Sequence, residues 1–513
     1  MTAQDGSEFD YVVVGAGAAG CVVANRLSAD GKRTVLLLEA GGSDEFFTAT
    51  RMLDLADLFK LWTDKTDWGY TTTPTPGADN RALPITQGKV LGGGSSTNGR
   101  IYLRGNRRDY DSWNQMGNEG WSYRDVLPYF KKSENYSGGE NAYHGAGGPL
   151  SIIDLPAPTP CSQAFMQASI DHGFKGPVDS NGEQQENTVG YCQSTTTRDL
   201  ARASTAVAFI HPIMSRQNFT LKTGATATRI LFEGTRAVGV EYMENGQKQQ
   251  ARARAEVIAS AGGFNCPKFL MQSGVGPADH LKSFGIPVVA NLPGVGQHLQ
   301  DHLLARMSWR LKKKQPALII LSEVNLFTYS RPGLEGASPE LQYMFAPFLF
   351  PEYGALDAGI TLTPVVSQPQ SYGNVQLRSS NPLDPPIINI NYLSSQTDVD
   401  VLIRGINLGR TLMSSHLLDE FRGDEVVPGP GLTTREQLEH YVRSTALTVW
   451  HPCGTCRMGH DDMSVVDPQL RVHGVKGLRV IDCSVIPRIV NVNLQATVIM
   501  IGEKGADMIL SGS

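Results

Sequence analysis

Three glycines near the N-terminus, Gly15, Gly17 and Gly20, have the G-x-G-x-x-G spacing that binds dinucleotides. The first permits a tight turn, the second lets the backbone approach a pyrophosphate, and the third lets a helix pack against a strand. Glu39 follows roughly 20 residues later, where a carboxylate accepts hydrogen bonds from an adenosine ribose. An acid at this position disfavours a 2′-phosphate. These residues predict dinucleotide binding and leave FAD and NAD as alternatives.

Three short elements flank the glycines and position them. Residues 11–14 form a β-branched run typical of a buried parallel strand, residues 21–27 have the composition of a helix, and residues 34–38 form a second strand run. Together they predict a βαβ unit of about thirty residues. The N-terminus of the helix would present unpaired N–H groups and the positive end of the helix dipole to a phosphate.

The composition restricts the class of protein. The 513 residues are 41% hydrophobic and 19% charged, with a formal net charge of −5 and a pI near 6.1. This balance suits a soluble globular protein and disfavours a nucleic-acid partner. We see neither a secretory signal nor an apolar run long enough to span a membrane, and we expect no membrane association. Seven cysteines, a low and odd number, suit a reducing compartment, so we expect a cytoplasmic protein.

Strand and helix patterns recur further along the chain. Four strand patterns of the parallel type follow at 219–223, 227–232, 237–242 and 257–259. Residues 145–200 are rich in glycine, proline, asparagine and glutamine and show few clear elements, which predicts a crossing into a second domain. Residues 310–440 mix strand and helix patterns, and the last seventy residues return to glycine-punctuated strand and helix.

Three long segments outside the βαβ unit carry glycines, small polar residues and a histidine. They are GKVLGGGSSTNGRIYLRGNRRDYDSW (88–113), GGFNCPKFLMQSGVGP (262–277) and HPCGTCRMG (451–459), which continues through 474–509. These segments resemble signature regions of the glucose–methanol–choline (GMC) oxidoreductases. With the N-terminal fingerprint, the resemblance runs from residue 9 to residue 510. The chain is therefore identified as a member of this family, and the resemblance implies that its dinucleotide is FAD.

The resemblance also implies the fold class, which is α/β in its core and α+β overall. A Rossmann-like FAD-binding domain, discontinuous in sequence, would take residues 1–150, 215–305 and 443–513. A substrate-binding domain built on an antiparallel sheet would take residues 151–214 and 306–442.

The residues that match FAD contacts of the family come from both ends of the chain. They are Gly15, Gly17, Ala18, Ala19, Gly20, Glu39, Ala40, Val90, Gly92, Gly93, Thr97, Asn98, Gly99, Ala227, Asp482, Val492 and Gln495. Glycines in the 88–105 loop would let the backbone run close to the flavin, and small polar side chains would donate hydrogen bonds. Some family members attach FAD through a histidine at the position of Thr97. Thr97 has no nucleophilic nitrogen, so we expect non-covalent FAD that acid or heat denaturation releases.

Two residues match the catalytic pair of the family. Alcohol oxidation by a flavin requires a base for the hydroxyl proton, and histidine is the usual choice near neutral pH. His451 matches the active-site histidine. The second position of the pair is histidine or asparagine, and here it is Asn493, which can hydrogen-bond the substrate oxygen but cannot take its proton at neutral pH. We expect His451 to be the sole base and Asn493 to position the substrate.

Other histidines and cysteines are expected to be structural. Cys453 and Cys456 form a C-x-x-C, but no second C-x-x-C accompanies it, so we interpret the segment as a packing turn and expect no metal site. His298 stands where the family usually has asparagine. The pair Asp301-His302 recurs in the family, and we expect both to be structural as well.

Two further segments bear on access to the pocket. Residues 46–62 have apolar residues at roughly helical spacing, which fits either a lid helix or a packed surface helix. The segment 303–326 is shorter than in many family members, which would open the substrate mouth.

The function that these patterns favour is FAD-dependent oxidation of a primary alcohol to an aldehyde. The apolar and aromatic stretch LQYMFAPFLFPEY favours an apolar or aromatic alcohol over a sugar. No acidic residue can be assigned to a quaternary ammonium, so choline is possible but unsupported. The alternatives are a lyase or a fatty-acid photodecarboxylase on the same fold, and a non-catalytic flavin-binding protein. The electron acceptor, oxygen or another molecule, and the oligomeric state are left open.

Overall fold

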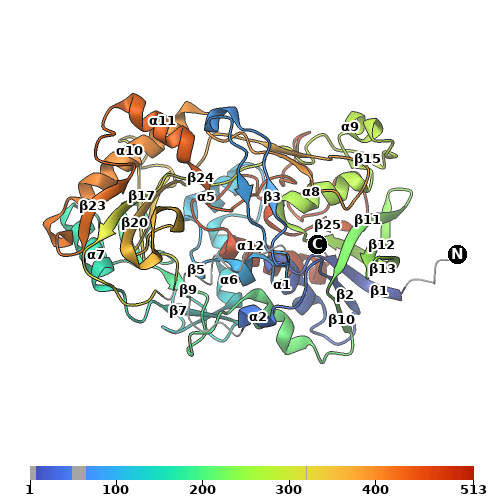
Figure 1. The fold of residues 1–513 in the computed structure, drawn as a ribbon. Helices are drawn as coiled ribbons and strands as arrows, with labels where there is room; N and C mark the ends of the chain where they lie inside the picture. The colour runs from blue at the N-terminus through green and yellow to red at the C-terminus, as the bar shows by residue number, and fades with distance from the viewer. Residues whose placement is uncertain (1–6, 49–64, 319, 513) are drawn as a thin grey trace.

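The computed structural model describes residues 7–48, 65–318 and 320–512, and the chain in it folds around two large sheets. The two sheets occupy opposite halves of the molecule (Figure 1). The N-terminal segment enters the first half, and the C-terminal helix returns to the same half. Most of the segment 46–62, where we expected a helix, lies outside the described residues.

The first sheet contains the predicted βαβ unit. Its strands are β10 (Phe219–Lys222), β2 (Val35–Leu38), β1 (Ser7–Val14), β13 (Gln247–Ala259), β12 (Arg236–Glu244) and β11 (Ala225–Glu233), in that spatial order, with β25 (Leu478–Val480) beside β13. Strands β10, β2, β1, β13 and β25 run parallel. The side chains of Val12, Val13 and Leu36 are fully buried, as expected where helices cover both faces of a parallel sheet.

The expectation of parallel strands at 227–232 and 237–242 is wrong. Strands β11, β12 and β13 pair antiparallel. The reason is the length of the connections, because two residues join each pair and a parallel pair requires a crossover of a dozen or more residues. The second connection is Asn245-Gly246, both with positive φ, which is a hairpin signal that the sequence contained.

Helices α1 (Ala18–Leu27) and α12 (Gln495–Ser511), which come from the two ends of the chain, pack against each other (Figure 1). They approach closely at Gly502, where an added Cβ would lie 3.0 Å from Cβ of Val22. Arg26 of α1 forms a salt bridge of 2.6 Å with Glu503 of α12, whose side chain is fully buried. Helix α6 (Tyr123–Ser133) also packs on α12. The packing of α1 on α12 therefore keeps the turn before α1 and the loop before α12 in the same part of the molecule.

The second sheet is antiparallel throughout. Its strands are β23 (Arg422–Val427), β17 (Met307–Leu311), β20 (Gly359–Val366), β19 (Leu341–Ala346), β18 (Val324–Thr328) and β8 (Thr188–Tyr191), with β16 (Leu303–Leu304) and β24 (Leu447–Thr448) at the end of β20. The predicted fold class, a Rossmann-like core combined with an antiparallel sheet, is confirmed. The sequence boundaries of the two domains stay a prediction.

Helices cover the second sheet. Helix α10 (Gln396–Met413) packs on β20 and contacts α11 (Arg435–Thr445) and α7 (Pro160–Asp171). Helix α7 lies in the stretch 145–200, where we expected few elements. Its start has a recognisable signal, because the side chain of Thr159 accepts a hydrogen bond from the N–H of Ser162 and Pro160 occupies the first turn.

Short elements complete the fold. The strands are β3 (Tyr70–Thr71), β4 (Pro84–Ile85), β5 (Ile101–Tyr102), β6 (Glu134–Tyr136), β7 (Leu150–Asp154), β9 (Gln193–Ser194), β14 (Val275–Gly276), β15 (Ala290–Asn291), β21 (Asn374–Gln376) and β22 (Ile387–Asn389). The helices are α2 (Glu45–Thr48), α4 (Gly94–Thr97), α5 (Arg107–Gln115), α8 (Gly262–Gln272) and α9 (Ala278–Ser283). Over the described ranges, no helix has the length and hydropathy that a membrane span requires.

Candidate active site

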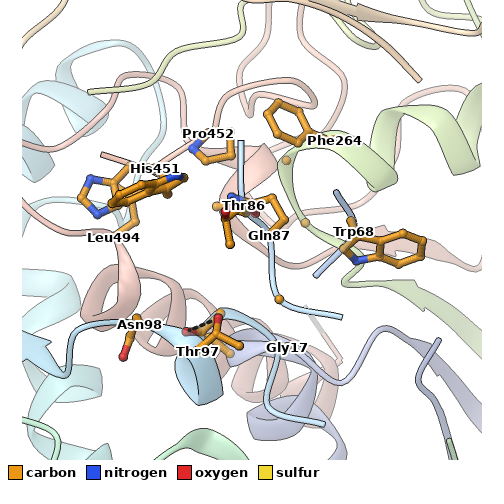
Figure 2. Close-up of a pocket in the computed structure, with 18 of the residues that line it drawn as sticks. Gly17, Trp68, Thr86, Gln87, Thr97, Asn98, Phe264, His451, Pro452 and Leu494 are labelled. Carbon is orange, nitrogen blue, oxygen red and sulfur yellow. Dashed lines mark hydrogen bonds between the residues drawn. The ribbon is translucent and has the colours of Figure 1, made fainter. Parts of the chain in front are cut away.

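One large pocket, with a volume of about 580 Å³, is lined by residues from both halves of the molecule. The βαβ turn, the loop 86–99 and α8 line it from the first half, while β16 and β19 line it from the second. Figure 2 shows His451 and Pro452 at one edge of this pocket and Gly17, Thr97 and Asn98 at the other. The pocket therefore unites the predicted dinucleotide turn with the predicted catalytic histidine.

The glycine-rich turn has the geometry that a dinucleotide requires. Gly15 has φ of +97°, and a Cβ on Gly20 would lie 1.9 Å from the carbonyl oxygen of Gly15, so both positions exclude a side chain. Gly17 differs, because no described protein atom lies within 4 Å of a Cβ added there, although Gly17 lines the pocket. The space above Gly17 is thus open to a ligand, as expected for the glycine that a pyrophosphate approaches.

Glu39 lies at the end of β2, where a ribose carboxylate is expected. It is 6% exposed, and its two oxygens accept the N–H groups of Ala16 at 2.9 Å and Gly41 at 2.8 Å. Burial raises the pKa of Glu39 to about 7, although these two hydrogen bonds act in the opposite direction. The backbone bonds hold the carboxylate at the edge of the pocket, within reach of a ligand hydroxyl.

The loop 88–99 packs directly on the βαβ turn. Gly93 has φ of +53°, and its added Cβ would lie 2.9 Å from Cα of Gly17. Helix α4 follows immediately, and its last residue, Thr97, and the next residue, Asn98, face the pocket (Figure 2). Two glycine-rich segments that are far apart in sequence therefore meet at one place.

Most residues that match FAD contacts line this pocket. Those that do are Gly15, Gly17, Ala18, Ala19, Glu39, Ala40, Gly93, Thr97, Asn98, Gly99, Ala227, Asp482 and Gln495. Gly20, Val90, Gly92 and Val492 do not appear in the lining. Gly20 and Gly92 permit tight backbone packing, and the side chains of Val90 and Val492 are buried at 1% and 0% exposure.

The two residues predicted to be catalytic, His451 and Asn493, meet in the structure although 42 positions separate them. Nδ2 of Asn493 lies 3.2 Å from Nε2 of His451. Within the described part of the chain, Oδ1 of Asn493 has no hydrogen-bond partner, and neither has the amide nitrogen Nε2 of Gln495. Both atoms are buried in residues that line the pocket, so they fit a bound flavin and a substrate oxygen.

His302, expected to be structural, also contacts the catalytic histidine. Its Nδ1 lies 2.9 Å from Nδ1 of His451, and its Nε2 lies 2.9 and 3.1 Å from the carbonyl oxygens of Val490 and Ser367. Carbonyl oxygens only accept, so Nε2 of His302 carries the proton and its Nδ1 accepts. His451 must then donate from Nδ1. This leaves Nε2 of His451 with its lone pair, directed toward Asn493.

Asp301 fixes the backbone of the same histidine. Its Oδ1 accepts the N–H of His451 at 2.7 Å, and its Oδ2 accepts from the hydroxyls of Thr448, at 2.5 Å, and Tyr392. The Asp301 carboxyl is 3% exposed, and burial raises its pKa to about 6. The adjacent residues Asp301 and His302 therefore orient the main chain and the side chain of His451.

Burial keeps His451 neutral. Removal from water, together with the neighbouring His302, lowers the pKa of His451 well below its ordinary value of 6.5. Burial also lowers the pKa of His302 to about 4. A neutral imidazole with a free lone pair is the form that accepts a proton from an alcohol.

Met344 and Phe345 of β19 line the far wall of the pocket, and they belong to the apolar stretch 341–353 that the sequence linked to the substrate. Sequence reasoning missed Leu304 and Arg306 of the same wall, which come from β16 and the residues that follow it. No motif marks these positions, because a short strand has the same local pattern whether or not a pocket lies beside it.

The C-x-x-C segment packs in the interior. Cys453 and Cys456 are fully buried with free thiols, and burial raises the pKa of both well above the ordinary value. The backbone of Cys453 pairs with Gln300. In the described ranges, no group of three or more histidine, cysteine or acidic side chains could hold a metal ion.

The sequence matches known proteins over most of its length. Residues 9–304 match the N-terminal region of the GMC oxidoreductases, and residues 369–502 match their C-terminal region. The oxygen-dependent choline dehydrogenase of Escherichia coli strain UMN026 is 41% identical, over 98% of this chain and 95% of that protein.

Solved structures share the whole fold. Pyridoxine 4-oxidase from Mesorbium loti superposes with a TM-score of 0.90 at 29% identity, covering 98% of this chain and 99% of that one. A formate oxidase variant from Aspergillus oryzae has a TM-score of 0.90 at 27% identity, covering 99% of each chain.

The fold and site define an FAD-binding oxidoreductase that acts on CH–OH donors. The chain belongs to the GMC oxidoreductase family.

Proposed function

We propose that this enzyme oxidises a neutral, apolar or aromatic primary alcohol to the aldehyde, with His451 as the base. Bound FAD supplies the hydride acceptor, at flavin N5. Nε2 of His451 takes the hydroxyl proton while the α-hydride leaves the alcohol carbon with its electron pair. Regeneration of the cofactor would require an electron acceptor, oxygen or another molecule. The cofactor contacts named above are part of this proposal, as is non-covalent attachment beside Thr97.

Asn493 complements His451 in this reaction. Its amide points toward Nε2 of His451, and its unpartnered Oδ1 gives the pair both a donor and an acceptor for a substrate hydroxyl. An alcohol oxygen held between the two side chains would lie within hydrogen-bond reach of the base, and such positioning lowers the entropic part of the barrier. Asn493 is not itself a base.

The observation that supports the choice of substrate is the pocket lining near the second sheet, which we call the substrate wall. It is mostly apolar, with Leu304, Met344, Phe345 and Phe348 among its members. The described lining of the whole pocket holds only two carboxylates, Glu39 and Asp482. Glu39 accepts an N–H of the βαβ turn, and Asp482 accepts the N–H groups of Gly262, at the start of α8, and of Ser484, so backbone donors already engage both carboxylates.

Choline is the second candidate, because the curated relatives that match this chain include choline dehydrogenases. A quaternary ammonium requires a carboxylate or free aromatic faces. The charged side chain in the substrate wall is a cation, Arg306, which forms an ion pair with Glu352 and lies 4.0 Å from the ring centroid of Phe350. This cation covers the face of Phe350 and would repel a quaternary ammonium in the same wall, so we favour a neutral alcohol over choline.

A panel of alcohols under anaerobic conditions tests the proposal. Benzyl alcohol, 1-hexanol, choline and glucose are mixed with the oxidised enzyme, and bleaching of the flavin band is followed by stopped flow. We expect benzyl alcohol and 1-hexanol to reduce the flavin with a second-order rate constant at least tenfold above that of choline. The reverse order would assign the enzyme to choline. Repeating the panel in air and with an artificial dye identifies the acceptor.

The variant His451→Gln tests the base. We expect the limiting rate of flavin reduction to fall by about 10²–10⁴-fold, the usual contribution of a general base. His460→Gln is the control, because His460 is exposed and lies outside the pocket lining. Reduction at the wild-type rate in His451→Gln would remove His451 from the mechanism. Failure of every alcohol to bleach the wild-type flavin would favour the lyase or photodecarboxylase alternative.

A further inference from the structure

Arg202 is a buried cation next to the loop 88–99, and it has no carboxylate partner among the described residues. It lies between β9 and the π-helix Ala206–Ile210, and its side chain is 2% exposed. Its guanidinium donates from Nη1 to Oδ1 of Asn98 at 2.9 Å and to the carbonyl oxygen of Ser95 at 3.3 Å. Among the described residues it forms no ion pair. A buried charge without an ionic partner destabilises the folded protein, so the presence of Arg202 here requires a reason.

The two hydrogen bonds to Asn98 fix the orientation of its amide. Besides Arg202, the backbone N–H of Arg100 donates to the same Oδ1 at 3.0 Å. Two donors on one atom identify that atom as the oxygen, so Nδ2 of Asn98 must point the other way. It donates to Oε1 of Gln495, the first residue of α12.

The orientation of Asn98 in turn fixes Gln495. Since Oε1 of Gln495 accepts from Asn98, the group that Gln495 presents to the pocket is the donor Nε2. This Nε2 is buried, and no described protein group accepts from it. Three side chains therefore form a directed chain of hydrogen bonds, which begins at a buried cation and ends at an unpartnered donor in the pocket. Hydrogen bonds in such chains polarise and strengthen one another at low dielectric.

We infer that Arg202 tunes the flavin of this enzyme through Asn98 and Gln495, and that it favours the reduced state. Hydride transfer places an electron pair and one negative charge on the flavin, whereas the oxidised ring is neutral. A donor polarised by a cation stabilises the reduced form more than the oxidised form. Arg202 is thus a positioning residue that raises the midpoint potential without touching the substrate. The inference rests on FAD binding and not on the identity of the alcohol.

Burial of Arg202 agrees with this role. Removal from water, together with the nearby Arg100, lowers the pKa of Arg202 to about 9. The guanidinium still carries its charge at neutral pH. A negative charge that arises in the pocket during turnover offsets part of the desolvation penalty.

The test compares Arg202→Met, which removes the charge and keeps much of the volume, with Arg202→Lys, which keeps the charge. Two readouts need no substrate: the midpoint potential of the bound flavin, measured against reference dyes, and the dissociation constant of sulfite, which adds to electron-poor oxidised flavins. We expect Arg202→Met to lower the potential and to weaken sulfite binding at least tenfold. For a two-electron couple, a tenfold change in equilibrium constant corresponds to about 30 mV. Arg202→Lys should recover part of both shifts.

Two further variants separate tuning from structural damage. Arg422→Met removes a partly buried guanidinium from β23, at the far edge of the second sheet (Figure 1), and should leave the potential and sulfite binding unchanged. Gln495→Leu removes the terminal donor and should lower the potential by itself. In the double variant Arg202→Met/Gln495→Leu, the two shifts should not add, because both changes interrupt one chain.

The outcomes decide the inference. A wild-type potential and wild-type sulfite affinity in Arg202→Met, with FAD bound, would overturn it. Strictly additive shifts in the double variant would overturn the path through Gln495. Should Arg202→Met fail to retain FAD, Arg202→Lys and Gln495→Leu carry the same test, and a wild-type potential in Gln495→Leu is then the contrary result.

Discussion

A hydrogen bond to His302, a residue from another part of the chain, determines that the proton of His451 lies on Nδ1. His302 can only accept at Nδ1, because two backbone carbonyls occupy its Nε2–H. His451 is thereby held as the tautomer whose free nitrogen faces Asn493. In this respect His302 acts as the orienting member of a catalytic pair, since the second nitrogen of a histidine determines what the first can do.

His302→Leu tests this role. The variant leaves Nδ1–H of His451 without an acceptor, so we expect the limiting rate of flavin reduction to fall by about 10–100-fold, as for other orienting partners of histidine. The KM for the alcohol should change little. His302→Asn, which places an oxygen near the position of Nδ1, should restore part of the rate.

The pH profile provides the readout that a purely structural role would not move. Because burial lowers the pKa of His451 well below 6.5, the base is already neutral at pH 7, and the wild-type limiting rate should be independent of pH above that value. Loss of the acceptor in His302→Leu should lower the limiting rate on the pH-independent plateau itself. A lowered melting temperature with an unchanged plateau in His302→Leu would show that the residue only packs.

Among the elements, the βαβ turn and the 88–99 loop show how glycine acts differently at neighbouring positions. Gly15 and Gly20 lack space for a side chain because protein backbone fills it. Gly17 has space, which is directed into the pocket. The first two positions are therefore constrained by folding, and the third is constrained by the ligand.

Gly17→Ala is expected to separate folding from cofactor binding. The new methyl group meets no described protein atom within 4 Å, so the melting temperature of the apoprotein should change by no more than a few degrees. The methyl group would occupy the space that the pyrophosphate approaches, so the dissociation constant of FAD should rise at least tenfold. Titration of apoprotein with FAD measures it.

Gly42→Ala is the matched control for this prediction. Its added Cβ also meets nothing within 4 Å, but Gly42 lies outside the pocket lining. We expect its FAD affinity to equal that of the wild type. Equal loss of FAD affinity in both variants would contradict a ligand-specific role for Gly17.

In the whole molecule, a buried charged cluster ties together segments around the short sheet β5–β9–β7–β6. Nδ1 of His144 lies 3.1 Å from Glu134, its Nε2 lies 2.7 Å from Asp179, and Arg104 forms a 2.6 Å salt bridge with Glu134. Burial disfavours the imidazolium, but the two carboxylates outweigh it and raise the pKa of His144. The same contacts lower the pKa of Glu134 and Asp179 despite their burial.

These shifts predict the pH dependence of stability. A raised folded pKa means that the stabilisation by His144 is complete below its unfolded pKa of 6.5 and is lost as the pH rises through the folded value. The carboxylates, with lowered pKa, stabilise above their unfolded values and lose this effect in acid. The cluster therefore contributes most between the ordinary pKa of Glu134, 4.5, and that of His144, 6.5.

His144→Gln should lower the free energy of unfolding by about 1–3 kcal/mol within that window, and the difference from wild type should shrink at higher pH. Denaturant unfolding at several pH values measures it. His211→Gln is the control, because its pair with Asp44 is partly exposed and should contribute less than about 1 kcal/mol. A difference that stays constant from pH 5 to pH 9 would show that charge on His144 is irrelevant.

The sequence by itself determined the features that adjacent residues encode. The strand 11–14, the glycine spacing and Glu39 predicted a dinucleotide turn, and the βαβ unit is confirmed. The segments 88–113 and 451–459 predicted the family and FAD, which the comparisons confirm. Such patterns survive without tertiary information because turn geometry and strand periodicity depend on neighbouring residues.

The tertiary structure decided everything that depends on distant residues meeting. His302 and His451 are 149 positions apart, and only the fold makes one the acceptor of the other. Arg202 and Gln495 are likewise joined only through Asn98. The substrate wall at Leu304 and Arg306 comes from the second sheet, whose short strands carry no motif. A hydrogen bond requires two atoms within about 3 Å in a fixed direction, and local sequence constrains neither when the partners lie on separate elements.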